Sequence, residues 1–331
     1  MSVTSGTRQQ TSPEAVKGQV VTDAASKLVV AQKRKSKWEE LGWALIYMTP
    51  ALAVFITFTF VPFFRAIWLS FFVTDPKGDT ARFNDVKYYS RILNLDGSGR
   101  DEYLKSIVTT VQFSLMTVPL GIIAAVGLAV LATAKVRAVE VFRTIFTSSI
   151  AISVASAGVI WALIYSPQIK ATQWLLDLLH VPASSLLNSP VTALAAIAFM
   201  TAWSALGFNF IIALSGIQAI PQDVYESGLI DGANGWKAFR FITLPLLTPT
   251  LLFLLIISTI SCFQAFTQFQ VLIGNDGPDG STNVFVMGIF NAFWKDNRYG
   301  FASAMSVVLF AVLLVLTLVQ FRLLDRRVHY Q

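Results

Sequence analysis

Neutral polar side chains interrupt the long apolar stretches of this 331-residue chain, and they are the residues best suited to hold a ligand. Hydroxyls and amides form hydrogen bonds with a polyol, and aromatic rings stack on its apolar faces. The same residue types also join helices to one another inside a membrane, which is the alternative interpretation. The candidates for a substrate pathway are Ser153, Thr201, Ser204, Phe208, Asn209, Phe263, Gln264 and Phe266.

Ionisable side chains are almost absent from the same stretches. Arg65 is the exception, and it lies close enough to the end of its stretch to reach the membrane surface. The sequence contains no metal-ligand cluster, nucleophile–base pair or phosphate-binding loop. It therefore predicts a protein that is not an enzyme and that binds no metal or cofactor itself. Proton-coupled carriers also need ionisable groups at membrane depth, whereas sodium coupling through backbone carbonyls stays open.

Membrane helices are the elements that must position these residues. The chain is 54% hydrophobic and only 13% charged, whereas a soluble domain carries about a quarter charged residues. Its apolar runs are continuous rather than alternating, which favours helices over barrel strands. We predict an all-α polytopic membrane protein with about six transmembrane helices, at residues 42–72, 106–134, 144–166, 191–217, 246–273 and 302–321.

The basic residues indicate topology. The net charge is +6, but most Lys and Arg residues lie beside hydrophobic runs, so we exclude nucleic acid as a partner and expect a lipid bilayer. Their distribution predicts that both termini are cytoplasmic. We expect residues 1–41 to form a cytoplasmic tail, disordered to about Lys27 and then helical on the membrane surface. Residues 42–331 form the transmembrane domain, and the only cysteine, Cys262, is expected to be a buried small hydrophobe.

One predicted cytoplasmic loop, residues 218–245, is patterned like a pair of helices. Pro221 can open the first helix, and Gly232 and Gly235 can turn the chain. The residues that share one face of the first helix are Val224, Tyr225, Gly228 and Leu229. The second apolar face comprises Trp236, Phe239 and Ile242, and we expect Pro245 to end it.

From Glu226 to Pro245 the sequence resembles the cytoplasmic EAA loop of permease subunits of binding-protein-dependent ABC importers. That pattern is E-A-A, three residues, G, nine residues, I-x-L-P, and this chain departs from it with Ser227-Gly228 in place of two alanines. The matching positions are Glu226, Gly232, Ile242, Leu244 and Pro245, with Asp231-Gly232-Ala233 and Pro249 as in its commoner form. The resemblance implies that the ATPase-coupling residues are Tyr225, Glu226, Ser227, Gly228, Asp231, Gly232, Ala233, Leu244 and Pro245.

A wider resemblance, over residues 42–331, is to the carbohydrate-uptake class of these permeases, which includes maltose and glycerol-3-phosphate importers. It is carried by the stretches 142–144, 275–278, 319–322 and 328–331. It implies the type I ABC importer permease fold in a bacterial or archaeal cell membrane. The implied partners are a second related permease, two copies of an ATPase subunit that holds ATP and Mg²⁺, and an extracytoplasmic solute-binding protein.

The resemblance also bears on the substrate. In maltose-type permeases the substrate contacts fall on three of the matching spans, and six of the eight pathway candidates lie near those positions. The other two candidates, Asn209 and Gln264, are included because they are polar. The spans without charge favour a neutral sugar or oligosaccharide, whereas the C-terminal resemblance favours glycerol-3-phosphate or a glycerophosphodiester. A stand-alone secondary carrier or channel, and a membrane receptor or scaffold, are the alternatives from other classes. Co-purification of the chain with an ATPase subunit would distinguish an ABC importer permease from these alternatives.

Overall fold

The computed structural model describes residues 40, 42–95, 102–133, 139–166, 168, 173–174, 177, 186–190, 192–274 and 276–325. Apart from Glu40, the predicted cytoplasmic tail lies outside the described residues, and so do Asn275 and the stretch 328–331. The chain forms two compact units, Met1–Arg65 and Ala66–Gln331.

The first unit contains most of a 28-residue apolar helix, Gly42–Leu69, none of which is buried in its most apolar window. Its later part comprises η1 (Ile56–Phe60), a π-helical turn, and α2 (Val61–Leu69). Proline lacks the amide hydrogen of the helical ladder and crowds the carbonyl four residues before it. The wide π-turn directly before Pro62 relieves this crowding, so Pro62 does not break the helix, and Pro50 also lies within it.

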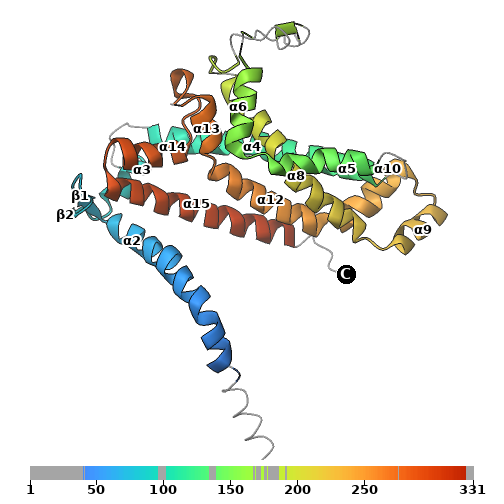
Figure 1. The fold of residues 1–331 in the computed structure, drawn as a ribbon, viewed down its shortest axis with the longest axis horizontal. Coiled ribbons are helices and arrows are strands. Elements are labelled where there is room, and N and C mark those ends of the chain that lie inside the picture. Colours follow the sequence, from blue (N-terminus) through green and yellow to red (C-terminus); the bar gives the residue numbers. More distant parts are fainter. Residues whose placement is uncertain are drawn as a thin grey trace, which may run out of the picture. The chain divides into compact units, whose positions relative to one another are not determined.

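In the second unit three helices are long and apolar enough to cross a membrane: α4 (Glu102–Ala132), α8 (Ala193–Gln218) and α15 (Tyr299–Asp325) (Figure 1). Two bent pairs supply further candidates. The first pair joins α5 (Val139–Thr147) and η2 (Ser148–Ala151) to α6 (Val154–Ile164) through a bend of 103°. The second joins α10 (Gly235–Ala238), η4 (Phe239–Thr243) and α11 (Leu244–Leu246) to α12 (Thr248–Phe263) through a bend of 66°. If each pair is one span, the described residues contain six, as predicted.

Two of the predicted spans are wrong in detail. The span expected at 144–166 bends at Ser153, whose Oγ accepts a hydrogen bond from the Ser156 amide at 3.1 Å and so caps α6. The span expected at 246–273 stops at Phe263 and resumes as α13 (Thr267–Leu272). Pro245 does not end the preceding helix either, because it lies inside α11. Apolar residues continue on both sides of each break, so hydropathy alone does not reveal it.

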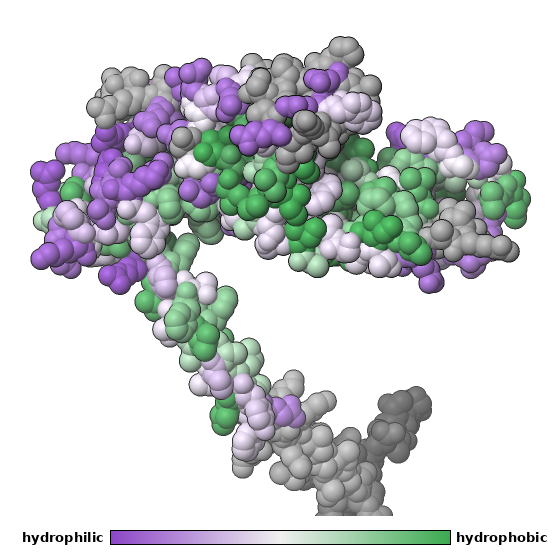
Figure 2. Space-filling model, turned by 45° about the horizontal axis from the view of Figure 1, so that its top comes forward, coloured by the Kyte–Doolittle hydropathy of each residue, from purple (hydrophilic) through white to green (hydrophobic). Residues whose placement is uncertain are grey.

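Short elements connect the long helices at one end of this unit. Strands β1 (Phe72–Thr74) and β2 (Thr80–Phe83) form an antiparallel hairpin, with Phe72 opposite Phe83. The hairpin was not predicted, although Asp75 and Gly78 are typical turn residues and the Asp75 carboxylate accepts the amide of Asp79 at 2.8 Å. The other short elements are α3 (Lys87–Ile92), η5 (Pro278–Gly280), α14 (Phe285–Phe290) and η6 (Asn291–Lys295). Hydrophilic side chains gather at the hairpin end (Figure 2).

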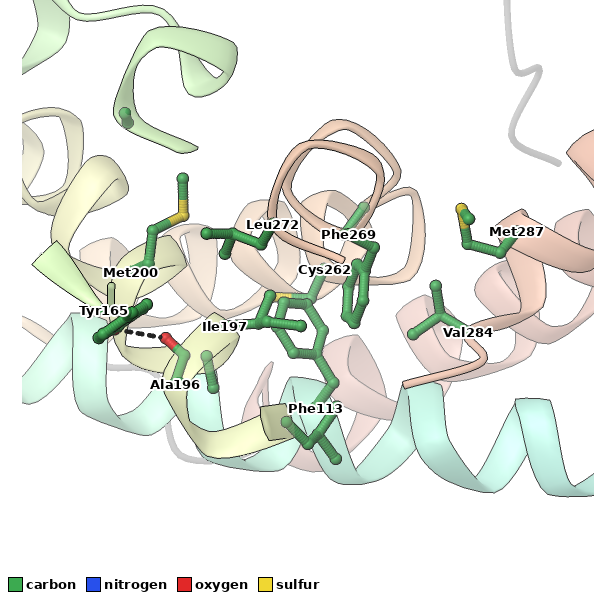
Figure 3. Close-up of a cluster of buried hydrophobic side chains, with 14 of the residues drawn as sticks. Phe113, Tyr165, Ala196, Ile197, Met200, Cys262, Phe269, Leu272, Val284 and Met287 are labelled. Atoms are coloured by element: carbon green, nitrogen blue, oxygen red, sulfur yellow. Dashed lines mark hydrogen bonds between the residues drawn. The ribbon is translucent and has the colours of Figure 1, made fainter. Parts of the chain in front are cut away.

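A hydrophobic cluster of the second unit lies where α4, α6, α8, α12 and α13 meet (Figure 3). The ring centroids of Phe113 and Phe269 are 4.9 Å apart with their planes at 67°, the edge-to-face arrangement that aromatic pairs favour. The Tyr165 hydroxyl donates to the carbonyl of Ala196 at 2.9 Å and ties α6 to the start of α8. Apolar side chains such as Leu115 and Ile123 point outwards from α4, as expected for a helix that faces lipid.

Candidate functional site

The loop that resembles the EAA motif folds as a helix, a turn and a second helix, as predicted. The first helix is α9 (Gln222–Ile230), and the chain returns through α10, η4 and α11. Pro221 is the residue before α9 rather than its first helical residue. The side chain of Gln222 donates to the Glu226 carboxylate at 2.9 Å, one helical turn away. Leu244 and Pro245 lie in α11, directly before the 66° bend into α12.

The turn after α9 requires glycine at position 232. The Ala233 amide donates to the Gly228 carbonyl at 2.8 Å, and the Gly232 amide donates to the Leu229 carbonyl at 3.1 Å. With Asp231 as the C-cap, these two bonds define a Schellman motif, which places the residue after the cap in the left-handed region. Gly232 has φ +79°, a conformation that L-residues avoid. This geometry explains a glycine at that position in the motif.

Gly228, the departure from the motif, lies where the two arms of the loop touch. A Cβ atom at this position would overlap Cδ1 of Ile242 on the returning arm. Close by, the hydroxyls of Tyr225 and Thr243 are 3.0 Å apart and form a second link between the arms. The glycine therefore permits close approach of the arms, which offsets the helix propensity that it sacrifices.

The outer face of this loop is apolar, both at the end of α9 and on the arm that returns through α10 and η4. Ile230 is 88% exposed, and Leu229, Trp236 and Phe241 are also exposed large apolar residues. Glu226, Ser227, Asp231 and Gly232 are exposed in the same loop. An apolar surface with a polar rim is typical of a docking surface for another protein. Ile230 and Phe241 were not singled out in the sequence, although large apolar residues in a short loop between spans are a usable signal.

The second feature is a cavity of about 430 Å³ inside the second unit, bounded by α4, α6, α8, α12 and α13. Its position follows from the break after Phe263, because the chain between α12 and α13 leaves the helical path and Gln264, Ala265 and Phe266 line the space. The volume is within the range of small-molecule sites, about 300–1,000 Å³.

Hydroxyl and amide groups supply the chemistry of the cavity wall, and none of the lining residues is Asp, Glu, Lys, Arg or His. The Thr201 hydroxyl donates to the Ile197 carbonyl at 2.8 Å, and the Ser204 hydroxyl donates to the Thr201 carbonyl at 2.9 Å. These two oxygens therefore face a ligand as acceptors. Donors can come from the amides of Asn209 and Gln264 and from the other hydroxyls of the wall, such as that of Ser261.

Most of the predicted pathway residues meet at this cavity, which brings together Thr201, Ser204, Phe208, Asn209, Gln264 and Phe266. Two do not line it. Ser153 caps α6, and only the next residue, Val154, reaches the cavity. Phe263 faces the other side of α12 and borders a separate small void with Phe285 and Val308.

Several lining residues were not among the candidates. They are Thr117 and Gly121 on α4 and Ser258 and Ser261 on α12. Ser258 and Ser261 are one helical turn apart on α12, a spacing that places both on one face. That periodicity is the signal that would have identified them. Thr117 has Ser114 one helical turn before it, but Ser114 does not line the cavity, so this spacing alone does not identify Thr117.

The chain matches a known family of membrane transport proteins. Residues 98–330 match the family described as binding-protein-dependent transport system inner membrane component. An sn-glycerol-3-phosphate transport system permease protein of Brucella abortus is 31% identical over 285 residues, which cover 86% of this chain and 94% of that protein. A trehalose/maltose transport system permease protein of Thermococcus litoralis is 32% identical over 285 residues, with the same two coverages.

Among solved structures, a crystal structure of a bacterial ABC transporter involved in the import of the acidic polysaccharide alginate resembles this chain. The TM-score is 0.72 at 20% identity, and the match covers 87% of this chain and 98% of that one. At this level of identity the likeness shows that the two chains share a fold.

Proposed function

This chain belongs to the family of binding-protein-dependent transport system inner membrane components, and from that membership we propose that it forms half of the pathway of an ATP-driven importer for a carbohydrate. It is a permease subunit, an inner-membrane component and not an enzyme. The observation that carries the carbohydrate assignment is the cavity of about 430 Å³, lined by hydroxyls, amides and aromatic rings without a charged residue. A relative of 32% identity, named for trehalose and maltose, supports it.

The chain couples to a separate ATPase through residues 226–245. The exposed apolar face around Ile230 supports this, since it offers a surface that another protein can bury. ATP and Mg²⁺ are then held by two copies of the ATPase subunit. A second, related permease completes the pathway, and an extracytoplasmic solute-binding protein delivers the substrate. The loop reaches the ATPase only if it is cytoplasmic, which places both termini on the cytoplasmic side, as the distribution of basic residues also predicts.

Cross-linking tests the coupling proposal. The chain's only cysteine, Cys262, is buried, so a cysteine introduced at an exposed site reacts selectively. Ile230→Cys should cross-link to the ATPase subunit in membranes and should react with an impermeant thiol reagent only after the cells are opened. Leu115→Cys, on the lipid-facing side of α4, is the matched control and should do neither. Labelling of Ile230→Cys in intact cells would overturn the topology, and absence of the cross-link would overturn the coupling.

Glycerol-3-phosphate or a glycerophosphodiester is the second candidate substrate, because a relative of 31% identity is named for glycerol-3-phosphate. A buried phosphate requires cationic partners, and the cavity lining offers none from this chain. Uptake assays with the complete transporter, comparing maltose and trehalose with glycerol-3-phosphate, separate the two candidates.

A further inference from the structure

Three arginines gather around two aromatic rings at the hairpin end of the second unit. The guanidinium carbon of Arg298 lies 4.4 Å from the centroid of the Phe301 ring, and that of Arg91 lies 5.9 Å from the same centroid. The ring of Tyr88 packs edge-on against Phe301, with 5.3 Å between the centroids. Burial raises the pKa of the Tyr88 phenol, and the charges of these two arginines and of Arg82 lower it. All three guanidinium groups therefore lie near one side chain.

The arginines come from three different elements, which are β2, α3 and the turn directly before α15. The Gly300 amide donates to the Thr74 hydroxyl at 3.1 Å and so ties the hairpin to the first turn of α15. The side chain of Ile92 is fully buried in a cluster with Phe301 and Met305, which ties α3 to α15. Backbone contacts and core packing therefore hold three like charges close together.

None of the three guanidinium groups has a hydrogen-bonding or ion-pairing partner among the described residues. Like charges that are held together repel one another, and an anion between them offsets that repulsion. The planar fork of arginine suits the oxygens of a phosphate in particular, because it can donate two parallel hydrogen bonds. The arrangement therefore indicates a site for a phosphate-bearing ligand.

The surroundings of the arginines indicate where that phosphate comes from. Arg298 directly precedes the 25-residue apolar stretch Tyr299–Leu323, which is long enough to cross a membrane, so its side chain lies at the depth of the lipid headgroups. Trp294 is 68% exposed four residues before Arg298, and Phe83 is 60% exposed directly after Arg82. Exposed aromatic residues at the end of a span are typical of the membrane–water interface. A soluble anion needs no such surroundings.

We propose that Arg82, Arg91 and Arg298 form a headgroup site for an anionic phospholipid in the leaflet at the hairpin end. The guanidinium groups donate to the phosphate oxygens, and the exposed aromatic residues lie against the upper part of the acyl chains. A zwitterionic lipid binds more weakly, because its own ammonium group cancels the charge of its phosphate. The site goes beyond the proposed function, since it depends neither on the transported solute nor on which leaflet faces the cytoplasm.

Thermal unfolding of the purified full chain in lipid nanodiscs tests the site without any partner protein. Nanodiscs of phosphatidylcholine are compared with nanodiscs that contain increasing fractions of phosphatidylglycerol. A ligand that binds only the folded state stabilises it, so the unfolding midpoint should rise with the phosphatidylglycerol fraction and then saturate. Inorganic phosphate and glycerol-3-phosphate, added to phosphatidylcholine nanodiscs at constant ionic strength, should produce no rise.

A charge-matched pair of double variants separates the site from general attraction to an anionic membrane. Arg91→Gln with Arg298→Gln should weaken the apparent affinity for phosphatidylglycerol by roughly 10-fold, because charge-assisted hydrogen bonds are lost. Lys77→Gln with Lys105→Gln removes the same charge from exposed positions on the hairpin and in the first turn of α4, and should change the affinity by less than about 2-fold. Comparing the two lipids within each variant removes any loss of stability from the broken contacts with Phe301.

Equal dependence on phosphatidylglycerol in the two double variants would overturn the proposal. Equal stabilisation by inorganic phosphate would overturn it in favour of a soluble anion. A wild-type chain that is indifferent to phosphatidylglycerol would also overturn it and would leave the arginines to an acidic surface of a partner protein. If the arginine double variant does not fold, Arg82→Gln decides the matter, because Arg82 is exposed and makes no contact with the Phe301 ring. It should weaken the affinity by about 3-fold or more, and unchanged affinity would refute the site.

Discussion

Replacement of Gly232 is the sharpest test of the coupling loop. The backbone conformation of Gly232 predicts a penalty for any L-residue, whereas its open surroundings predict no penalty for a larger side chain. Gly232 has φ +79°, and no atom lies within 4 Å of the position that a Cβ would occupy. A substitution therefore meets no steric obstacle, and the entire penalty arises from the left-handed backbone. We predict an order of tolerance that follows backbone preference and not side-chain size.

The magnitude follows from the left-handed penalty. An L-residue in this region loses roughly 1–2 kcal/mol relative to glycine, whereas asparagine visits the region more readily. About 1.4 kcal/mol reduces the population of the native turn relative to its alternatives by 10-fold. The β-branched side chain of Gly232→Val carries the larger penalty, since such residues are genuine outliers at positive φ. We expect Gly232→Asn to keep most of the activity, Gly232→Ala to lose part of it, and Gly232→Val to abolish it.

The assay is ATP-dependent uptake by membranes that contain the complete transporter, with the amount of inserted chain measured in parallel. Insertion should be equal in all three variants, because Gly232 lies in the turn between α9 and α10 and not in a helix that could cross the membrane. Affinity of the ATPase subunit for the permease, measured by titration, should fall in the same order as uptake. Normal uptake in Gly232→Val, or a loss in Gly232→Asn as large as in Gly232→Val, would refute the role of the left-handed turn.

Three further substitutions have expected outcomes. Gly228→Ala should retain uptake within about 2-fold in the same assay, because the Cδ1 end of Ile242 can rotate away and alanine regains about 1 kcal/mol of helix propensity. Gly300→Ala should destabilise the folded chain by about 1–3 kcal/mol in denaturant unfolding, because its Cβ would overlap the backbone carbonyl of Phe72, which cannot rotate away. Arg65→Ala should change uptake by less than about 2-fold because Arg65 is exposed, and a large loss would show that its charge acts within the membrane.

The sequence predicted local structure where the spacing of particular residues fixes the backbone geometry. The glycine at position 232 and the Ile-x-Leu-Pro ending identify a turn between two helices, and the structure contains that turn with its hydrogen bonds. Continuous apolar runs likewise predicted six spans, because a membrane requires long helices whatever their tertiary contacts. Both signals depend only on residues close together in the sequence, so they can be recognised without knowing how the helices pack.

Features that depend on packing escaped prediction. The breaks at Ser153 and after Phe263 occur within apolar stretches, and they decide which side chains face the cavity. Phe263 was therefore expected in the pathway, although it faces another void, whereas Thr117 was missed because only the approach of α8 and α12 gives it a role. Orientation around a helix axis cannot be read from a run that is apolar on every face.

ATP dependence of uptake tests the central claim most directly. The chain would be reconstituted in proteoliposomes with its partner permease, the ATPase subunit and the solute-binding protein, and accumulation of labelled maltose or trehalose would be followed. Uptake should require enclosed ATP and the ATPase subunit, and it should disappear in Gly232→Val. Equal uptake without the ATPase subunit would contradict the assignment and indicate a carrier that works alone.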